Sequence, residues 1–278
     1  MHDTLARVAK DFSKYAAVLL DLDGTVYHED HALPGAIELI RRLQLERRTL
    51  ACITNSTSSP QRLVRRLAHM GVQLRDADVY TAAAAAADYV LDTFGPRPRV
   101  FNLATEGLHE LLDGKVEWVV SPPPSAHDLE SYGPCDAVVV GAPANVYATD
   151  DRQRAALYYC RGGAALIGIC ADRVYPSPRG LEYGSGPLTH FVAYGANVQP
   201  FFTGKPQPIF FEELCRKLGV APARCLLIGD NLEADIAGAK ALGMETVLTL
   251  SGVTRADDLR DLNDAHRPDV VIRDLREL

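Results

Sequence analysis

The chain has 278 residues, of which 47% are hydrophobic and 23% are charged, a composition typical of a globular enzyme that excludes extended disorder. Its formal net charge of -7 argues against a nucleic-acid-binding surface. No apolar run reaches membrane-spanning length, and residues 1–14 lack the apolar stretch of a signal peptide, so we expect a cytoplasmic protein without membrane attachment.

Residues 16–25 form an apolar segment that predicts a buried parallel strand ending in Asp21 and Asp23, with Gly24 next. Two carboxylates this close repel each other, and a carboxylate that leaves an apolar core has to be hydrogen-bonded, paired or bound to metal. The pattern therefore indicates a nearby cation. A plain Asp-Gly turn explains the same residues equally well when they are taken alone.

A helix over residues 33–43 and a strand over residues 49–53 follow, which indicates a parallel crossover unit. The strand leads into a hydroxyl-rich segment that begins with Thr54 and Asn55 and precedes a helix over residues 60–70. Hydroxyls, an amide and free backbone N–H groups near a helix start suit an anion. Ser and Thr also favour this position as simple helix caps.

Residues 78–195 have their own alternation of strands and helices, which predicts an inserted α/β domain between core segments 1–77 and 196–278. Its expected helices cover residues 81–94, 106–112 and 150–161, and its expected strands cover residues 99–103, 116–120, 136–141 and 164–169.

A loop rich in Pro and Gly is expected over residues 170–186, either as part of a pocket or as a solvated connector. Gly184 and Gly186 at its end indicate the start of a helix more than a phosphate cradle. The candidates for substrate selectivity in this loop are Asp172, Arg173, Tyr175, Arg179 and Tyr183.

The last third returns to the first pattern. Lys205 precedes a helix over residues 209–218, and a buried strand over residues 224–230 ends in Asp230, with Asp235 five residues later. Further strands are expected over residues 245–250 and 269–272. If these strands share one parallel sheet, their carboxyl ends bring the acids, the lysine and the Thr54 hydroxyl together. Such a group suits phosphoryl transfer assisted by Mg²⁺.

Four motifs resemble, in order and context, those of haloacid-dehalogenase-superfamily phosphatases. The insertion lies where the nitrophenylphosphatase-like (NagD-like) subfamily has its type-two cap. This resemblance implies an α/β fold with a doubly wound parallel, Rossmann-like core sheet and an inserted α/β cap domain. The motifs are Asp21-Leu22-Asp23-Gly24-Thr25, Ile53-Thr54-Asn55-Ser56, Gly204-Lys205-Pro206 and Gly229-Asp230-Asn231-Leu232-Glu233-Ala234-Asp235.

By this resemblance, the protein is a Mg²⁺-dependent hydrolase of small phosphomonoesters. Asp21 is implied to be the nucleophile that forms an aspartyl-phosphate, and Asp23 the general acid and then the base. Asp23 also favours a phosphatase over a dehalogenase, because a halide leaving group needs no proton.

The resemblance further implies that Thr54, Asn55 and Lys205 hold phosphate, and that Lys205 takes part in catalysis by steadying both Asp21 and the phosphoryl oxygens. Mg²⁺ would be bound by Asp21, by the backbone carbonyl of Asp23 and by Asp230. Asp235 would orient Lys205 or a metal-bound water. The alternative for Asp235 is an exposed acid favoured by the helix dipole.

Two other functions remain open at this level: a phosphotransferase or mutase using the same aspartyl-phosphate, and a non-catalytic phosphate-binding regulatory protein. The expected substrate is a phosphorylated sugar, polyol, nucleotide or related metabolite. An exposed apolar cap surface would favour a homodimer. The six scattered cysteines are expected to be buried free thiols.

Overall fold

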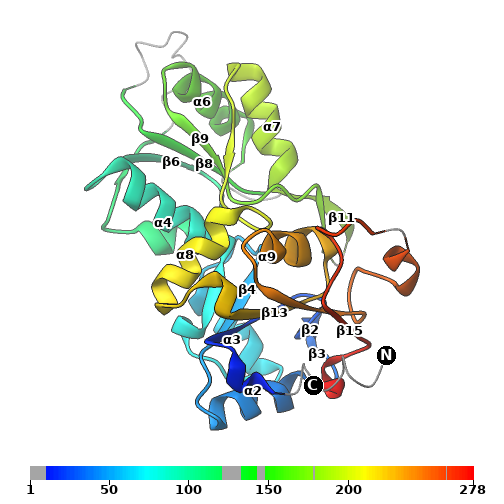
Figure 1. Cartoon of the computed structure of the whole chain (residues 1–278). Helices are drawn as coiled ribbons and strands as arrows, with labels where there is room; N and C mark the ends of the chain where they lie inside the picture. Colours follow the sequence, from blue (N-terminus) through cyan, green and yellow to red (C-terminus); the bar gives the residue numbers. More distant parts are fainter. Residues whose placement is uncertain (1–10, 121–132, 143–147, 178, 261) are drawn as a thin grey trace. The chain divides into compact units, whose positions relative to one another are not determined.

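The computed structural model describes residues 11–120, 133–142, 148–177, 179–260 and 262–278. The chain divides into two compact units (Figure 1), which we call the core unit and the inserted unit. Both are α/β structures with parallel sheets, as the fold class predicts. Among the described helices, none has the length and apolar character needed to cross a bilayer. The core unit comprises Met1–Thr54, Pro60–Tyr80 and Lys205–Leu278, and the inserted unit comprises Asn55–Ser59 and Thr81–Gly204.

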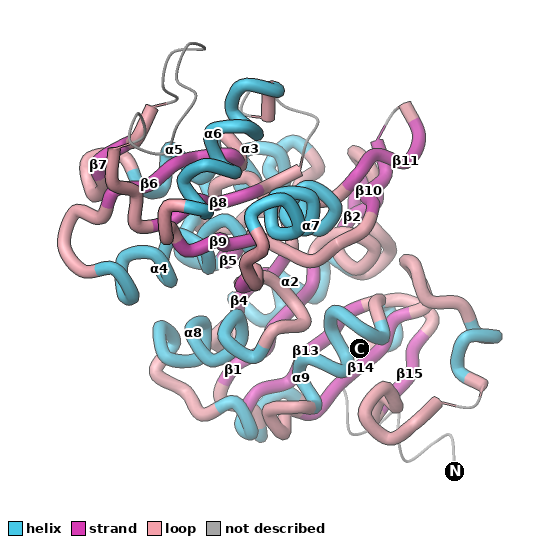
Figure 2. Tube along the Cα trace, turned by 90° about the horizontal axis from the view of Figure 1, so that it is seen from above, coloured by secondary structure: helices cyan, strands magenta, loops and turns pink. Residues whose placement is uncertain are grey.

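The core unit is built on a six-stranded sheet in the order β15-β14-β13-β1-β4-β5. β1 pairs in parallel with β13 on one side and with β4 on the other, so the chain winds outward from β1 in both directions. In Figure 2, β13, β14 and β15 lie side by side in this unit. The strands are β1 (Ala17–Asp21), β4 (Leu50–Thr54), β5 (Val79–Thr81), β13 (Cys225–Gly229), β14 (Glu245–Thr249) and β15 (Val270–Ile272).

Alternation along β1 decides which side chains meet the helices, because successive residues of a strand face opposite ways. Val18 and Leu20 point to one face and pack in a cluster with apolar residues of α2 (Ala36–Leu45) and α3 (Pro60–His69). Every residue of β1 is buried, so the strand needs no polar positions before Asp21. The other helices of this unit are α8 (Pro208–Leu218) and the short α9 (Gly238–Lys240).

The inserted unit has a five-stranded parallel sheet in the order β12-β9-β8-β6-β7. Val138 and Val140 of β8 pack in a cluster with α6 and α7, whereas Ala137 and Val139 pack with α4 and α5. Both faces are therefore covered, which explains the uninterrupted apolar run. The elements are α4 (Ala82–Phe94), β6 (Arg99–Leu103), α5 (Glu106–Leu112), β7 (Glu117–Trp118), β8 (Ala137–Val140), α6 (Asp150–Arg161), β9 (Ala165–Gly168), α7 (Ser185–Ala196) and β12 (Phe201–Phe202).

Three segments differ from the expectation. The predicted loop over residues 170–186 contains an antiparallel hairpin of β10 (Val174–Ser177) and β11 (Gly180–Tyr183). The strand ahead of Lys205 is β12, which joins the inserted sheet instead of the core sheet. The acidic helix after β13 begins with a π-helical turn, Leu232–Ala237, before α9.

Short elements complete the fold. A small hairpin of β2 (Tyr27–His28) and β3 (His31–Ala32) follows the first motif. All six cysteines are free and five of them are buried, as expected. In the described part of the chain, 3₁₀ turns occur at Phe12–Lys14, Asp76–Asp78, Pro222–Arg224, Ala256–Leu259 and Leu275–Glu277.

Candidate active site

The parallel pairing around β1 brings the polar ends of three strands to one edge of the core sheet. Asp21 is the last residue of β1 and aligns with Ile53, so Thr54 follows at the same level of β4. Leu20 aligns with Ile228, and Asp230 comes directly after β13. The side chains of Asp21, Thr54 and Asp230 are all buried. The strand ends therefore meet as the sequence predicts.

Lys205 links two of the acids of the core unit. Its Nζ lies 2.5 Å from Oδ1 of Asp21 and 2.6 Å from Oδ1 of Asp235. The second oxygen of Asp235 accepts a hydrogen bond from the backbone N–H of Asn231 at 3.1 Å. Asp235, in the π-helical turn, is thus buried and bonded to Lys205. The alternative that Asp235 is an exposed acid favoured by the helix dipole is therefore wrong.

The pKa values of this group reflect a shortage of positive charge. Burial raises the pKa of Asp21 well above its usual range, and the neighbouring Asp235 adds to the effect while Lys205 opposes it. Burial and the charge of Asp235 raise the pKa of Asp230 to about 7. Burial alone would lower the pKa of Lys205, but the charges of Asp21 and Asp235 raise it, so the ammonium stays protonated.

The residues present fit a hard divalent cation. Carboxylate oxygens of Asp21, Asp230 and Asp235 lie within 4.8 Å of one another, all on buried residues. Oxygen donors are the ligands that Mg²⁺ prefers, and one ammonium does not neutralise three carboxylates. Gly24 and Gly252 leave space beside Asp230. A Cβ added at Gly24 would lie 2.4 Å from Oδ2 of Asp230, and a Cβ added at Gly252 would lie 1.9 Å from the same oxygen.

Asp23 has different surroundings from Asp21. Its side chain is exposed in the core unit, just past the end of β1. Partial desolvation nevertheless raises its pKa, although the positive charges of His28 and Arg66 oppose the shift. Its backbone forms an isolated bridge with Tyr27, which ties it to the small β2–β3 hairpin. Asp23 is therefore accessible, whereas Asp21 is enclosed.

Asn55 belongs to the inserted unit, and its Nδ2 donates a hydrogen bond to Oδ1 of Asp172 in the same unit at 3.1 Å. The other selectivity candidates do not converge. Tyr175 and Tyr183 occupy adjacent positions of the hairpin register, so they face opposite ways. Arg179 pairs with Glu182 at 2.8 Å, and Arg173 is exposed.

Sequence reasoning missed the segment after β14. The backbone N–H of Val253 donates to Oδ2 of Asp230 at 2.6 Å, and the Ser251 hydroxyl donates to the carbonyl of Gly24 at 2.8 Å. The available signal was Ser251-Gly252 at the carboxyl end of a buried strand, where site residues gather in parallel sheets.

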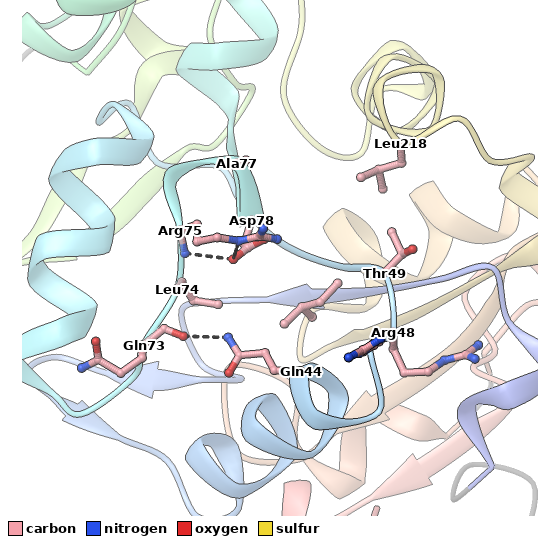
Figure 3. A pocket seen from close by; sticks show the side chains of 11 residues that line it. Gln44, Arg48, Thr49, Gln73, Leu74, Arg75, Ala77, Asp78 and Leu218 are labelled. Carbon is pink, nitrogen blue, oxygen red and sulfur yellow. Dashed lines mark hydrogen bonds and ion pairs between the residues drawn. The ribbon is translucent and has the colours of Figure 1, made fainter.

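Figure 3 shows a separate cavity of about 720 Å³. Its lining includes Thr49 and Leu50, so it opens at the amino end of β4, the opposite edge of the core sheet from Asp21. Several of its polar side chains already bond to other groups of the core unit. Arg75 pairs with Asp78 at 2.6 Å, Gln44 donates to the carbonyl of Gln73 at 2.9 Å, and Arg48 donates to the carbonyl of Phe12 at 2.6 Å. We therefore place the candidate active site at the carboxyl edge and not in this cavity.

Comparison with known proteins shows the family of the chain. Residues 18–115 match the family model described as haloacid dehalogenase-like hydrolase, and residues 202–278 match a second model of the same type. An acid sugar phosphatase from Staphylococcus aureus is 30% identical over 267 residues, which cover 95% of this chain and 96% of that protein.

Two solved structures share the fold. The 4-nitrophenylphosphatase from Thermotoga maritima has a TM-score of 0.82 and 30% identity, covering 96% of this chain and 97% of that one. A glycerol phosphate phosphatase from Mycobacterium tuberculosis, solved in complex with magnesium, has a TM-score of 0.82 and 27% identity, covering 96% of this chain and 77% of that one. The chain belongs to the haloacid dehalogenase superfamily, among its nitrophenylphosphatase-like phosphatases.

Proposed function

We propose that this phosphatase is a Mg²⁺-dependent hydrolase of small phosphomonoesters that works through an aspartyl-phosphate on Asp21. The observation that carries the proposal is the buried group in which Lys205 is held between Asp21 and Asp235, with Asp230 close by. A lysine bonded to the nucleophile offers donors to the incoming phosphoryl oxygens without leaving the site. The relative solved with magnesium supports the choice of metal.

In the proposed reaction, an Oδ of Asp21 attacks phosphorus and the bond to the alcohol oxygen breaks. Asp23 gives its proton to that oxygen, so the alcohol leaves neutral. Asp23 then takes a proton from water, which attacks phosphorus and releases inorganic phosphate from Asp21. The raised pKa and the exposure of Asp23 support both halves of this role.

Thr54, Asn55 and Lys205 are proposed to hold the phosphoryl group. Asp21, the backbone carbonyl of Asp23 and Asp230 are proposed to hold Mg²⁺. Bound there, the metal would neutralise charge between the nucleophile and the phosphoryl oxygens. Asp235 has hydrogen bonds to both of its oxygens, which supports a role in positioning Lys205.

The proposed substrate is a phosphorylated sugar, polyol, nucleotide or related metabolite. The relatives act, by their names, on sugar phosphates, nitrophenyl phosphate and glycerol phosphate. We propose that residues 78–195 form the cap that selects among these esters. A cytoplasmic location is proposed on the support of six free cysteines.

The test is a screen of phosphate release from these ester classes with Mg²⁺ and with a chelator, on the wild type and on Asp21→Asn. We expect turnover that needs Mg²⁺ and falls by at least about a thousandfold in Asp21→Asn. Asp11→Asn, at an exposed aspartate of the core unit, is the matched control and should keep wild-type rates. Retained metal-dependent turnover in Asp21→Asn would refute the nucleophile, and transfer to an added alcohol would indicate a phosphotransferase.

A further inference from the structure

The inserted unit contains a polar contact that the proposed reaction does not use directly. The Asn55 amide donates to the Asp172 carboxylate, and both side chains are half-buried. Asn55 follows β4 and begins the segment Asn55–Ser59 of the inserted unit, whereas Asp172 lies between β9 and the β10–β11 hairpin. A carboxylate accepts hydrogen bonds only, so the contact fixes which end of the Asn55 amide faces Asp172.

The backbone of Asp172 is held by the beginning of α7. The N–H of Gly186 donates to the Asp172 carbonyl at 3.1 Å. A Cβ at Gly184 would lie 2.2 Å from the same carbonyl oxygen, and a Cβ at Gly186 would lie 2.5 Å from the carbonyl oxygen of Ala171. Any side chain at these positions would displace the backbone at Asp172. The two glycines therefore allow α7 to fix this residue.

The other end of the Asn55 amide is enclosed as well. A Cβ at Gly204 would lie 2.8 Å from Oδ1 of Asn55 and 2.7 Å from the carbonyl oxygen of Ile169. The amide thus lies between the backbone of Gly204 and the carboxylate of Asp172. The hydrogen bond to Asp172 directs Nδ2 of Asn55 to the carboxylate and leaves Oδ1 on the side of Gly204, so Asp172 can determine how Asn55 is presented.

We propose that Asp172 is a positioning residue, which fixes Asn55 for phosphate binding instead of contacting the substrate. The proposal rests on the proposed function, in which Asn55 holds phosphate. A free carboxylate close to a phosphoryl group would repel it, whereas a carboxylate that accepts from Asn55 acts through that amide. Asp172 then governs affinity for the phosphoryl group common to all substrates and not the choice among leaving groups.

The experiment compares KM and kcat for p-nitrophenyl phosphate, and inhibition by inorganic phosphate, in the wild type and three variants. Asp172→Ala should raise both KM and the inhibition constant about tenfold, because the hydrogen bond that orients Asn55 is lost, with a smaller change in kcat. Asp172→Asn should restore both constants, because its amide oxygen still accepts from Asn55. Glu182→Gln removes a neighbouring carboxylate of the hairpin and should change neither.

A double-mutant cycle separates this role from direct contact. If Asp172 acts through Asn55, Asp172→Ala should have no further effect in an Asn55→Ala background. Additive effects, or an unchanged inhibition constant for inorganic phosphate, would overturn the proposal, as would failure of Asp172→Asn to restore binding. Absence of turnover in the wild type would refute the proposed function instead, and calorimetric binding of inorganic phosphate to the same variants would still decide the role of Asp172.

Discussion

Asp21 and Asp23 are two residues apart, yet their surroundings separate them. Asp21 is enclosed and bonded to Lys205, which suits a group that must stay in place to attack. Asp23 is exposed and has a raised pKa, which favours the protonated form and suits a proton donor.

Asp23→Ala should slow hydrolysis of alkyl phosphates by about a hundredfold to ten-thousandfold, because an alkoxide leaves poorly without a proton. Hydrolysis of p-nitrophenyl phosphate should lose less, because nitrophenolate is stable unprotonated. Steady-state rates on the two ester types measure the difference. The matched control is Glu38→Ala, at an exposed acid of α2, and an equal loss on both esters in Asp23→Ala would contradict the acid role.

Asp230 contributes repulsion when no cation is bound, because it shares a buried site with Asp21 and Asp235. Asp230→Asn should therefore stabilise the metal-free protein, with a gain in melting temperature of about 2–4 °C for each kcal/mol of repulsion relieved. It should also lose most of the stabilisation that Mg²⁺ gives the wild type. Thermal unfolding with a chelator and with Mg²⁺ tests both effects.

Glu233→Gln, at an exposed acid of the π-helical turn that follows Asp230, serves as the control for Asp230→Asn. It should leave the melting temperature and its response to Mg²⁺ unchanged. A destabilised Asp230→Asn protein that still responds fully to Mg²⁺ would show that Asp230 is structural and not a metal ligand.

At the scale of elements, the turn before β5 depends on Asp78. Its carboxylate accepts from the backbone N–H of Arg75 at 2.9 Å and from the Arg75 guanidinium at 2.6 Å. Burial alone would raise the pKa of Asp78, but these bonds lower it below its usual value. A folded-state pKa below the unfolded one means that the stabilisation is present at neutral pH and is lost as the pH falls.

Asp78→Asn should cost roughly 1 kcal/mol of unfolding free energy at neutral pH, the worth of one hydrogen bond. The difference from the wild type should shrink as the pH falls below about 4, the usual pKa of an aspartate in the unfolded chain. Denaturant unfolding across this range measures it. Asp76→Asn, at the exposed acid of the same turn, is the control, and a pH-independent difference would contradict the electrostatic cause.

The elements that the sequence predicts best are those with strong apolar signals. The strands around β1 and β8 are buried throughout, so their runs are continuous and their carboxyl ends can be located. The β10–β11 hairpin was missed because β11 is largely exposed and Pro176 interrupts the pattern, leaving no burial signal to detect.

The sequence did not predict which sheet β12 joins or how Lys205 and Asp235 contact each other, because both depend on tertiary packing. β12 has only two residues, and its partner β9 is set by tertiary packing that periodicity does not encode. The motifs identified Lys205 and Asp235 as site residues by resemblance. Their direct contact depends on the π-helical turn, which turns Asp235 inward and has no signature in the residue pattern.

At the scale of the whole molecule, we expect a homodimer formed through the inserted unit. α7 exposes Phe191 and Tyr194, three residues apart on one face, and Tyr194 is 92% exposed. The adjacent β11 exposes Leu181 and Tyr183. Large apolar side chains gathered on one surface are typical of protein interfaces.

A variant with Phe191→Glu and Tyr194→Glu should sediment as a monomer, since charges on this face oppose burial, whereas the wild type should sediment as a dimer. Retention of hydrolysis would show that the variant remains folded. Lys115→Glu and Arg97→Glu, at exposed positions elsewhere in the inserted unit, provide a control for added negative charge. A monomeric wild type would contradict the expectation.

β1 pairs with β13, as Ala17 with Cys225, although these strands lie far apart in the sequence, so β1 is synthesised long before its partner. A ribosome completes β1, β4 and the whole Thr81–Gly204 segment before it reaches Lys205 and β13. Until then one edge of β1 lacks its native neighbour, and Asp21 lacks the ammonium that it faces in the finished protein. The nascent chain therefore carries the proposed nucleophile long before the site around it exists, and a chain that terminates after the inserted unit lacks Lys205 and Asp230.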